Sequence, residues 1–213
     1  MLAALAAEPD PHTTVSDPEA ALDVHVADSL SGLEVAELSS ARRIADIGAG
    51  AGFPGLVLAI ALRRAQVDLI ESVGRKTAVI DRLIQAAELG NARSITARVE
   101  DYGRVGASLG GGREAYDAVT ARAVGSLALV VEYAAPLLRP DGILIAWKGA
   151  RDEAEEAAGA VAAERVGMAV KEVLSVTPYP GSKRRHLHEY RKIAPTPPEF
   201  PRRAGMARKR PLA

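Results

Sequence analysis

The residues best placed to do chemistry form a glycine-rich segment, Asp46-Ile47-Gly48-Ala49-Gly50-Ala51-Gly52-Phe53-Pro54-Gly55. A short apolar strand precedes it, and an apolar helical segment (residues 56–62) follows. Glycines at alternate positions allow the backbone to turn sharply and to approach a ligand closely, because no Cβ intervenes. Free N–H groups at the start of the next helix can then face that ligand. The segment therefore predicts a nucleotide-type pocket at a βα turn of an open α/β sheet.

An acidic residue stands where such a pocket needs one. Residues 67–71 are expected to form the second strand, which ends on Glu71. A carboxylate at this strand end can accept hydrogen bonds from both hydroxyls of a ribose. The strand, the glycine corner, the helix and the acid together favour an adenosine-containing cofactor over a tight turn beside a solvated glutamate.

The residues alone leave the cofactor and the activity open. Gly50, Gly52 and Gly55 satisfy G-x-G-x-x-G, which is compatible with an NAD-dependent oxidoreductase. Asp46 before three alternating glycines instead resembles the first motif of S-adenosylmethionine-dependent methyltransferases. A methyltransferase of a small molecule, a protein or another RNA and a non-enzymatic RNA-binding module are further alternatives.

Further motifs follow in order and narrow the resemblance to one family. They are Glu71-Ser72-Val73-Gly74-Arg75-Lys76, Arg98-Val99-Glu100-Asp101, Thr120-Ala121-Arg122-Ala123, Ala146-Trp147-Lys148-Gly149, Pro195-Thr196-Pro197 and Pro201-Arg202-Arg203-Ala204-Gly205. With residues 46–55 they resemble the RsmG (GidB) family, bacterial methyltransferases of N7 of a guanine in small-subunit ribosomal RNA. The resemblance covers most of residues 17–213. It implies S-adenosyl-L-methionine as cofactor and guanine 527, in the 530 loop of 16S rRNA, as the target.

The resemblance also implies the residues of the site. The cofactor-binding residues would be Gly48, Gly50, Phe53, Glu71, Val99, Glu100 and Arg122. Glu71 would hold the ribose, Val99 and Glu100 would flank the adenine, and Arg122 would lie near the cofactor and the incoming base. The candidates for RNA phosphate contacts are Arg75, Lys76, Lys148, Arg185, Arg202, Arg203 and Lys209, with the Arg202–Arg203 pair the strongest.

No catalytic residue is assigned. Guanine N7 carries an in-plane lone pair, so the protein must supply position rather than a general base. His25 and Asp28 share one helical face. We interpret them as a hydrogen-bonded cluster that docks the helix, with a catalytic pair as the alternative. The family usually has longer helical material before this point. The N-terminal lobe is therefore expected to be reduced, or the sequence to begin downstream of the true start.

Composition excludes several classes of chemistry. Cysteine is absent, which rules out a disulfide framework, a thiolate metal site and a cysteine nucleophile. The four histidines show no H-E-x-x-H spacing, and no metal is expected. No apolar run approaches the ~20 residues that span a bilayer, so we expect a cytoplasmic protein. Net charge is zero, yet residues 183–213 hold ten Lys/Arg against two Glu, which suggests a polyanionic partner.

Strand and helix patterns alternate from residue 42 onward, as a parallel sheet requires. We expect a Rossmann-like α/β methyltransferase fold, with a mostly parallel sheet and a C-terminal antiparallel pair at residues 170–176 and 186–193. Asp17 and Pro18 predict a helix start, after which Leu22, Val26 and Leu30 would face the core. A helix is expected over residues 127–138, and a strand over 143–148. The division is a helical segment (1–38), a methyltransferase domain (39–194) and an extended, basic, Pro-rich tail (195–213) that contacts RNA.

Overall fold

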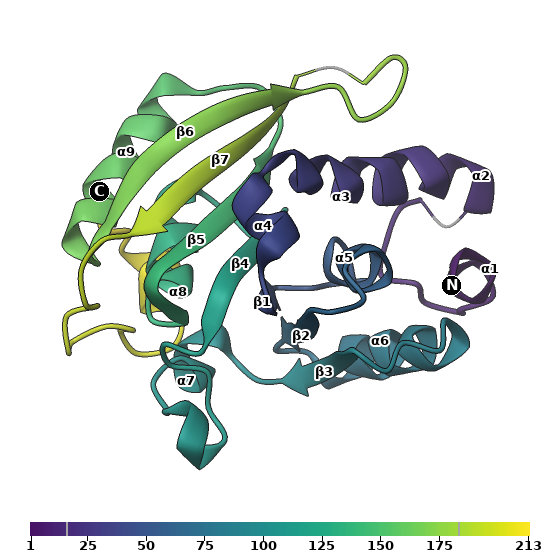
Figure 1. Ribbon diagram of the computed structural model, residues 1–213, viewed down its shortest axis with the longest axis horizontal. Helices are drawn as coiled ribbons and strands as arrows, with labels where there is room; N and C mark the ends of the chain where they lie inside the picture. The colour runs from purple at the N-terminus through teal and green to yellow at the C-terminus, as the bar shows by residue number, and fades with distance from the viewer. Residues whose placement is uncertain (16, 183) are drawn as a thin grey trace.

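A mostly parallel sheet forms the centre of the structure, a computed structural model that describes residues 1–15, 17–182 and 184–213. Over these residues the strand order is β3-β2-β1-β4-β5-β7-β6 (Figure 1). The strands are β1 (Arg43–Ile47), β2 (Gln66–Glu71), β3 (Ala92–Thr96), β4 (Tyr116–Arg122), β5 (Leu138–Lys148), β6 (Met168–Val176) and β7 (Arg185–Lys192). Strands β1 to β5 pair in parallel, while β7 is antiparallel to both β5 and β6. The predicted Rossmann-like fold and its C-terminal antiparallel pair are confirmed.

Helices cover both faces of the sheet. In chain order they are α1 (Leu2–Ala6), α2 (Pro18–Ala21), the π-helix η1 (Leu22–Ala27), α3 (Asp28–Leu30), the 3-10 helix η2 (Ser31–Glu34), α4 (Ala36–Ser40), α5 (Gly55–Ala61), α6 (Gly74–Ala86), α7 (Val99–Tyr102), the 3-10 helix η3 (Ala107–Leu109), α8 (Leu127–Ala134), α9 (Glu153–Arg165) and α10 (Met206–Lys209). Alternate strand residues point to opposite faces. Ile44 and Ala118 therefore belong to the core shared with α5 and α6, and Ala45 and Val119 to the core shared with α8 and α9.

The strand order places a ligand site at one position. The chain moves outward from β1 through β2 to β3, then returns to pair β4 with the other side of β1. Loops that leave neighbouring strands β1 and β4 thus diverge to opposite faces of the sheet, and the gap between them is where open α/β sheets bind ligands. The glycine corner follows β1, and Arg122 ends β4.

The N-terminal helical segment departs from the predicted orientation. Its start is confirmed, because the Asp17 side chain accepts a hydrogen bond from the Ala20 amide at 2.9 Å. The expectation that Leu22 and Leu30 face the core is wrong: they are 53% and 37% exposed, while His25 is buried. The cause is the π-helical turn over residues 22–27, which widens the helix and breaks the 3.6-residue period.

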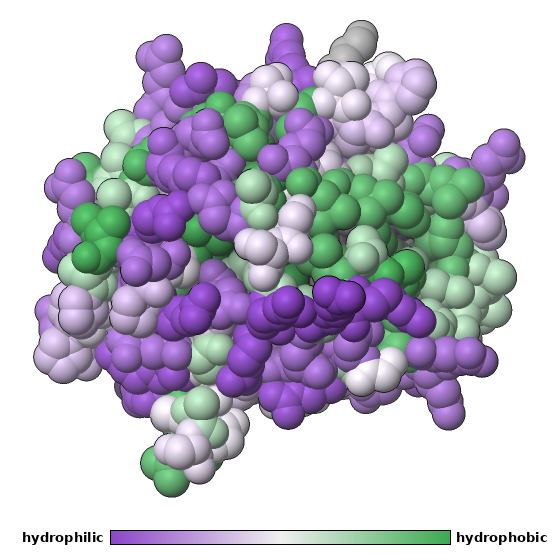
Figure 2. Space-filling view, in the orientation of Figure 1, coloured by the Kyte–Doolittle hydropathy of each residue, from purple (hydrophilic) through white to green (hydrophobic). Residues whose placement is uncertain are grey.

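The widened turn leaves apolar side chains at the surface. Leu22 and Leu30 are exposed. Helix α3 packs against α5, and Ile60 of α5 is exposed as well. Figure 2 shows apolar surface over the region that α3 and α5 occupy in Figure 1. In exchange, the buried face of this segment carries polar groups toward the sheet.

Two boundaries also differ near β5. The helix predicted to reach residue 138 ends at Ala134, because Leu137 and Leu138 are buried in the core under α8 and the strand starts at Leu138. The segment Pro140-Asp141-Gly142 is a bulge within β5, where pairing shifts from Tyr116↔Leu138 to Ala118↔Ile143. At the far edge of the sheet, β6 has a similar shift between Val170 and Glu172.

The C-terminal tail (residues 195–213) is not extended as predicted. It folds back over the α8 face, where Phe200 and Leu212 are buried and α10 forms a short helix. Arginine side chains bind its backbone carbonyls: Arg113 donates to Phe200 O at 2.9 Å, and Arg165 donates to Leu212 O at 2.8 Å. The tail therefore belongs to the folded body.

Arg202 is one of the groups that hold the tail. Its guanidinium donates two hydrogen bonds, of 2.7 and 2.6 Å, to the carboxylate of Glu132 in α8, and Glu132 is only 2% exposed. Both donors of this fork are engaged within the protein. Arg202 is the strongest candidate for a phosphate contact in the sequence. In the structure it anchors the tail to α8.

Replacing Arg202 by alanine leaves the Glu132 carboxylate buried without its partner. We expect Arg202→Ala to lower the free energy of unfolding by about 2–3 kcal/mol, less than for a fully buried pair because Arg202 is partly exposed. Urea denaturation followed by circular dichroism measures this. Arg203→Ala is the matched control, since Arg203 is exposed beside it and should change stability by less than about 0.5 kcal/mol. Equal effects of the two substitutions would contradict the assignment.

Candidate functional site

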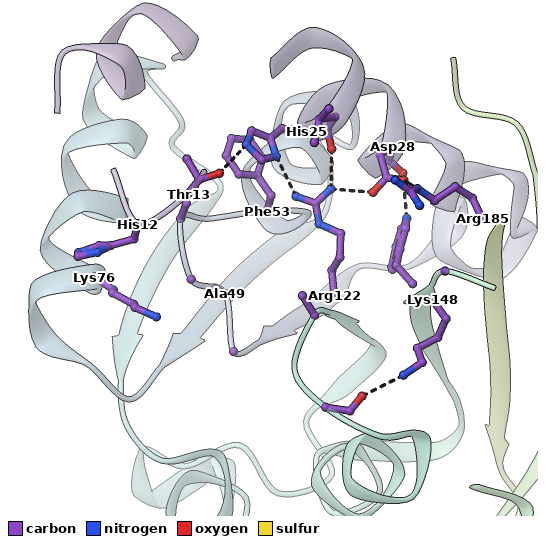
Figure 3. A pocket seen from close by; sticks show the side chains of 18 residues that line it. His12, Thr13, His25, Asp28, Ala49, Phe53, Lys76, Arg122, Lys148 and Arg185 are labelled. Carbon is purple, nitrogen blue, oxygen red and sulfur yellow. Dashed lines mark hydrogen bonds and ion pairs between the residues drawn. The ribbon is translucent and has the colours of Figure 1, made fainter. Parts of the chain in front are cut away.

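A cavity of about 560 Å³ lies at the carboxyl ends of β1 and β4 (Figure 3). Its lining residues are His12, Thr13, Val24, His25, Asp28, Gly48, Ala49, Gly50, Ala51, Phe53, Lys76, Arg122, Ala123, Gly125, Trp147, Lys148, Gly149 and Arg185. Pockets for cofactors and similar small ligands have volumes of roughly 300–1,000 Å³. The cavity is thus large enough for a nucleoside cofactor.

Asp46 holds the glycine corner in place. Its side chain accepts hydrogen bonds from the Gly55 amide at 2.9 Å and from the Thr120 hydroxyl at 3.0 Å. A Cβ at Gly55 would lie 2.8 Å from the Asp46 carboxylate, so only glycine fits there. Burial raises the pKa of Asp46 to about 7, because the charged form loses its hydration.

Gly50 provides the test of whether the corner fits a cofactor. Its φ of +58° is a left-handed conformation that favours glycine, and an added Cβ would meet nothing closer than Gly48 O at 3.8 Å. The added atom would therefore point into the cavity and not into the protein. A backbone that faces an open cavity without a side chain is what close approach to a cofactor requires, and the corner fits S-adenosyl-L-methionine.

Four side chains, from η1, α3, the glycine corner and β4, close the upper side of the cavity. The His25 ring stacks on the Phe53 ring, with centroids 4.5 Å apart and planes 11° from parallel. Arg122 donates to the Asp28 carboxylate at 2.8 Å and lies 5.8 Å from the Phe53 ring centroid (Figure 3). The π-helical segment, the glycine corner and β4 are joined here, which agrees with our interpretation of His25 and Asp28 as a docking cluster.

The hydrogen-bond partners of His25 define its protonation. Val15 O can only accept, so His25 Nε2, 3.0 Å away, carries a proton, and Nδ1 accepts from Arg122 Nη2 at 3.3 Å. Desolvation, reinforced by the nearby positive charge of Arg122, lowers the pKa of His25. The ring is neutral at physiological pH, and no nitrogen is left to act as a base toward the cavity.

The structure brings together only part of the predicted site. Seven predicted residues line the cavity: Gly48, Gly50, Phe53, Arg122, Lys76, Lys148 and Arg185. Seven do not: Glu71, Val99, Glu100, Arg75, Arg202, Arg203 and Lys209. Position in the cavity assigns no role by itself, and the roles of all these residues stay predictions.

The acids expected at the cofactor are engaged within the protein. Glu71 accepts hydrogen bonds from the amides of Gly50, at 3.2 Å, and Val73, at 3.0 Å. Glu100, which is buried, accepts from the Gly205 amide of the tail at 2.8 Å. Each carboxylate keeps lone pairs for a further donor. The glycine corner and the tail are thus tied to the residues predicted to hold ribose and adenine.

Sequence reasoning assigned no role to several residues of the cavity, and three of these, His12, Thr13 and Trp147, have polar side-chain atoms. His12 and Thr13 line it from the N-terminal segment, which lacks any periodic pattern that could have placed it. Trp147 belongs to a motif of the resemblance, but no role was predicted for it; its Nε1 donates to Asp28 O at 2.9 Å. Among the described residues, no group of three or more acidic or histidine side chains could hold a metal ion.

Comparison with solved structures defines the fold. The chain is similar to a SAM-dependent methyltransferase from Aquifex aeolicus, with a TM-score of 0.61 and 14% identity over 82% of this chain and 93% of that chain. It is also similar to the mitomycin 7-O-methyltransferase MmcR, with a TM-score of 0.62 and 15% identity over 78% of this chain and 53% of that one. These likenesses show that the chain has the fold shared by the two methyltransferases.

Sequence comparison defines the family. The model of the family described as rRNA small subunit methyltransferase G (GidB) matches residues 12–187, and the chain belongs to this family. Ribosomal RNA small subunit methyltransferase G of Rubrobacter xylanophilus is 41% identical over 199 residues, 92% of this chain and 75% of that protein. The protein of the same name in Chloroflexus aggregans is 41% identical over 200 residues, 94% and 82% of the two chains.

A methyl group at Gly50 should obstruct the cofactor. We expect Gly50→Ala to weaken binding of S-adenosylhomocysteine by about tenfold or more, because the new Cβ occupies cavity space. Isothermal titration calorimetry measures the affinity. Gly110→Ala is the matched control: its φ is +85° and nothing lies within 4 Å of the added Cβ, so it adds comparable backbone strain outside the cavity lining. Unchanged affinity in the Gly50 variant would contradict this placement of the cofactor.

Proposed function

We propose that the chain transfers the methyl group of S-adenosyl-L-methionine to N7 of a guanine in 16S rRNA, which by family resemblance is guanine 527 of the 530 loop. The observation that carries the proposal is a single cavity in which the glycine corner faces cations from three separate elements. Lys76 comes from α6, Lys148 from β5 and Arg185 from β7. An RNA substrate brings phosphates to such a rim.

The three cations differ in how firmly they are held. Lys148 Nζ forms an ion pair with Glu155 at 2.5 Å and donates to Gly125 O at 3.1 Å, so its ammonium is positioned. Arg185 Nε lies 3.4 Å from Asp28. Lys76 forms no ion pair within the described part of the chain, which leaves it the most direct candidate for a phosphate.

The reaction requires that the target base be positioned; it requires no proton transfer. When bound, S-adenosyl-L-methionine supplies a methyl group on a positively charged sulfur. Guanine N7 attacks that carbon with its in-plane lone pair, so no base has to remove a proton first. The protein must hold the base in line, at about 3–3.5 Å from the methyl carbon. The neutral, fully engaged His25 and the paired Arg122 suit a rigid wall against which a base can be held.

The end of β4 argues against methylation of an amino group. Methylases of exocyclic amines usually carry an Asn/Asp-Pro-Pro-aromatic string there, whereas this chain has Thr120-Ala121-Arg122-Ala123. The N7 edge of guanine is hidden in the deep, narrow major groove of duplex RNA, so the target base should be unpaired.

We further propose that 16S rRNA or the 30S particle is the partner, and that the protein acts in the cytoplasm. In this proposal the chain consists of a helical segment (1–38), a methyltransferase domain (39–194) and a basic tail (195–213). No helix in the described ranges is long and apolar enough to cross a membrane.

The function is tested by locating the methylated base. Small-subunit particles from cells that lack the gene are incubated with the purified protein and labelled S-adenosyl-L-methionine, and N7-methylguanine is mapped by chemical cleavage. We expect one modified guanine, at position 527. Modification at another atom or in another RNA would contradict the proposal. Conversion of NAD without any methyl transfer would favour an oxidoreductase.

Lys76 should contribute to RNA affinity through charge alone. We expect Lys76→Ala to weaken binding of small-subunit RNA uniformly and to reduce the slope of log affinity against log salt by about one. Filter binding at several KCl concentrations gives both values. Arg64→Ala is the control, since Arg64 is exposed in the turn before β2, at the opposite end of the sheet. An unchanged slope for Lys76→Ala would remove this residue from the interface.

A further inference from the structure

Among the described residues that line the cavity, Asp28 is the one acid, and one of its two carboxylate oxygens accepts no hydrogen bond. The residue is 6% exposed. Oδ2 accepts a hydrogen bond from Arg122 Nη1 at 2.8 Å. Oδ1 accepts no hydrogen bond from any described residue and has only an ion pair with Arg185 Nε at 3.4 Å. A buried acceptor without a donor is costly and rare, so this oxygen needs an explanation.

The placement of Asp28 is fixed by its backbone. Its carbonyl accepts hydrogen bonds from Trp147 Nε1 at 2.9 Å and from the Ser31 hydroxyl at 2.7 Å. If the carboxylate served only to neutralise Arg122, the guanidinium fork could engage both oxygens, as Arg202 does with Glu132. Here Arg122 reaches one oxygen and turns its other nitrogen to His25. A rigid acid with one oxygen that accepts no hydrogen bond can accept one from a ligand.

We propose that Asp28 determines specificity for guanine, by accepting hydrogen bonds from the N1–H and N2 amino groups of the target base. This inference rests on the proposed guanine-N7 activity. A carboxylate only accepts hydrogen bonds, and guanine presents two adjacent donors on that edge. Adenine presents an acceptor at N1, which a carboxylate repels. In this arrangement the cations of the rim bind the RNA phosphates, and the single acid binds the base.

Access to Oδ1 depends on one side chain. Arg185 approaches Oδ1 from β7, and its side chain is 37% exposed at the rim of the cavity (Figure 3). Its 3.4 Å contact is longer than the 2.8 Å contact of Arg122 on the other oxygen. An RNA phosphate at the rim attracts this guanidinium away from Asp28. The base then replaces one charged partner of the carboxylate by two neutral donors.

The same contact favours the reaction itself. As N7 forms its bond to the methyl carbon, the carbon–sulfur bond breaks and the positive charge passes from sulfur to the base, with no proton released. A carboxylate on the opposite edge of the base interacts more strongly with the methylated, cationic guanine than with the neutral one. Such an interaction is stronger in the transition state than in the ground state, which is the condition for catalysis.

The test changes the base and the residue together. Single-turnover methylation rates are measured on small-subunit RNA that carries guanine or inosine at the target position, since inosine keeps N7 and N1–H but lacks the N2 amino group. We expect the wild-type protein to prefer guanine by about tenfold or more, because inosine leaves a hydrogen bond to a charged group unmade. Asp28→Asn should be slower on guanine and should lose most of this preference. Asp23→Asn, an exposed acid on the same helical segment, should behave as wild type.

The ratio of the two rates separates specificity from a structural role. An Asp28→Asn protein that is slower on both RNAs but keeps the wild-type ratio would overturn the proposal. So would a wild-type protein that methylates both RNAs equally, a result that needs no variant to fold. A wild-type protein that methylates neither RNA would instead overturn the guanine-N7 function on which the inference rests.

Discussion

One buried carboxylate, that of Asp46, determines the shape of the ligand end of the sheet. It stands next to Thr120 in the pairing of β1 with β4 and binds that residue's hydroxyl, while its other oxygen binds the Gly55 amide at the start of α5. Burial of the acid is unfavourable, as its pKa of about 7 reflects. The two hydrogen bonds of the buried acid fix β1, β4 and α5 to one another, and the glycine corner between them therefore has one conformation.

The elements around this carboxylate could be predicted because their signals are local. Apolar strand segments alternate with helical ones, and the glycines mark the turn between the first pair. Parallel strands bring their carboxyl ends to one edge, so Gly50, Phe53 and Arg122 could be expected at one site although they are far apart in sequence. The cavity does contain all three. Spacing and topology were sufficient for this part of the site.

The remaining features depend on contacts that no local pattern reveals. The π-helical turn rotates His25 and Asp28 inward and Leu22 outward, against the apolar periodicity. Arg202 resembles a free cation in the sequence, but a buried glutamate seventy residues earlier binds it. The tail could not be predicted for the same reason, since its partners are arginines in distant loops and helices. In each case a partner remote in sequence outweighs the local preference.

The two strands that lie beyond β5, β7 and β6, have a consequence for the molecule as a whole. Strand β6 is one of the two edge strands of the described sheet, the other being β3, and its exposed Lys171 and Glu172 lie at the register shift described above. An open edge offers unpaired backbone groups to any other chain, and a charged, irregular edge discourages that pairing. With β7 antiparallel to β5 and β6 outside it, the apolar middle of the sheet ends in a charged, irregular border that discourages pairing with another chain.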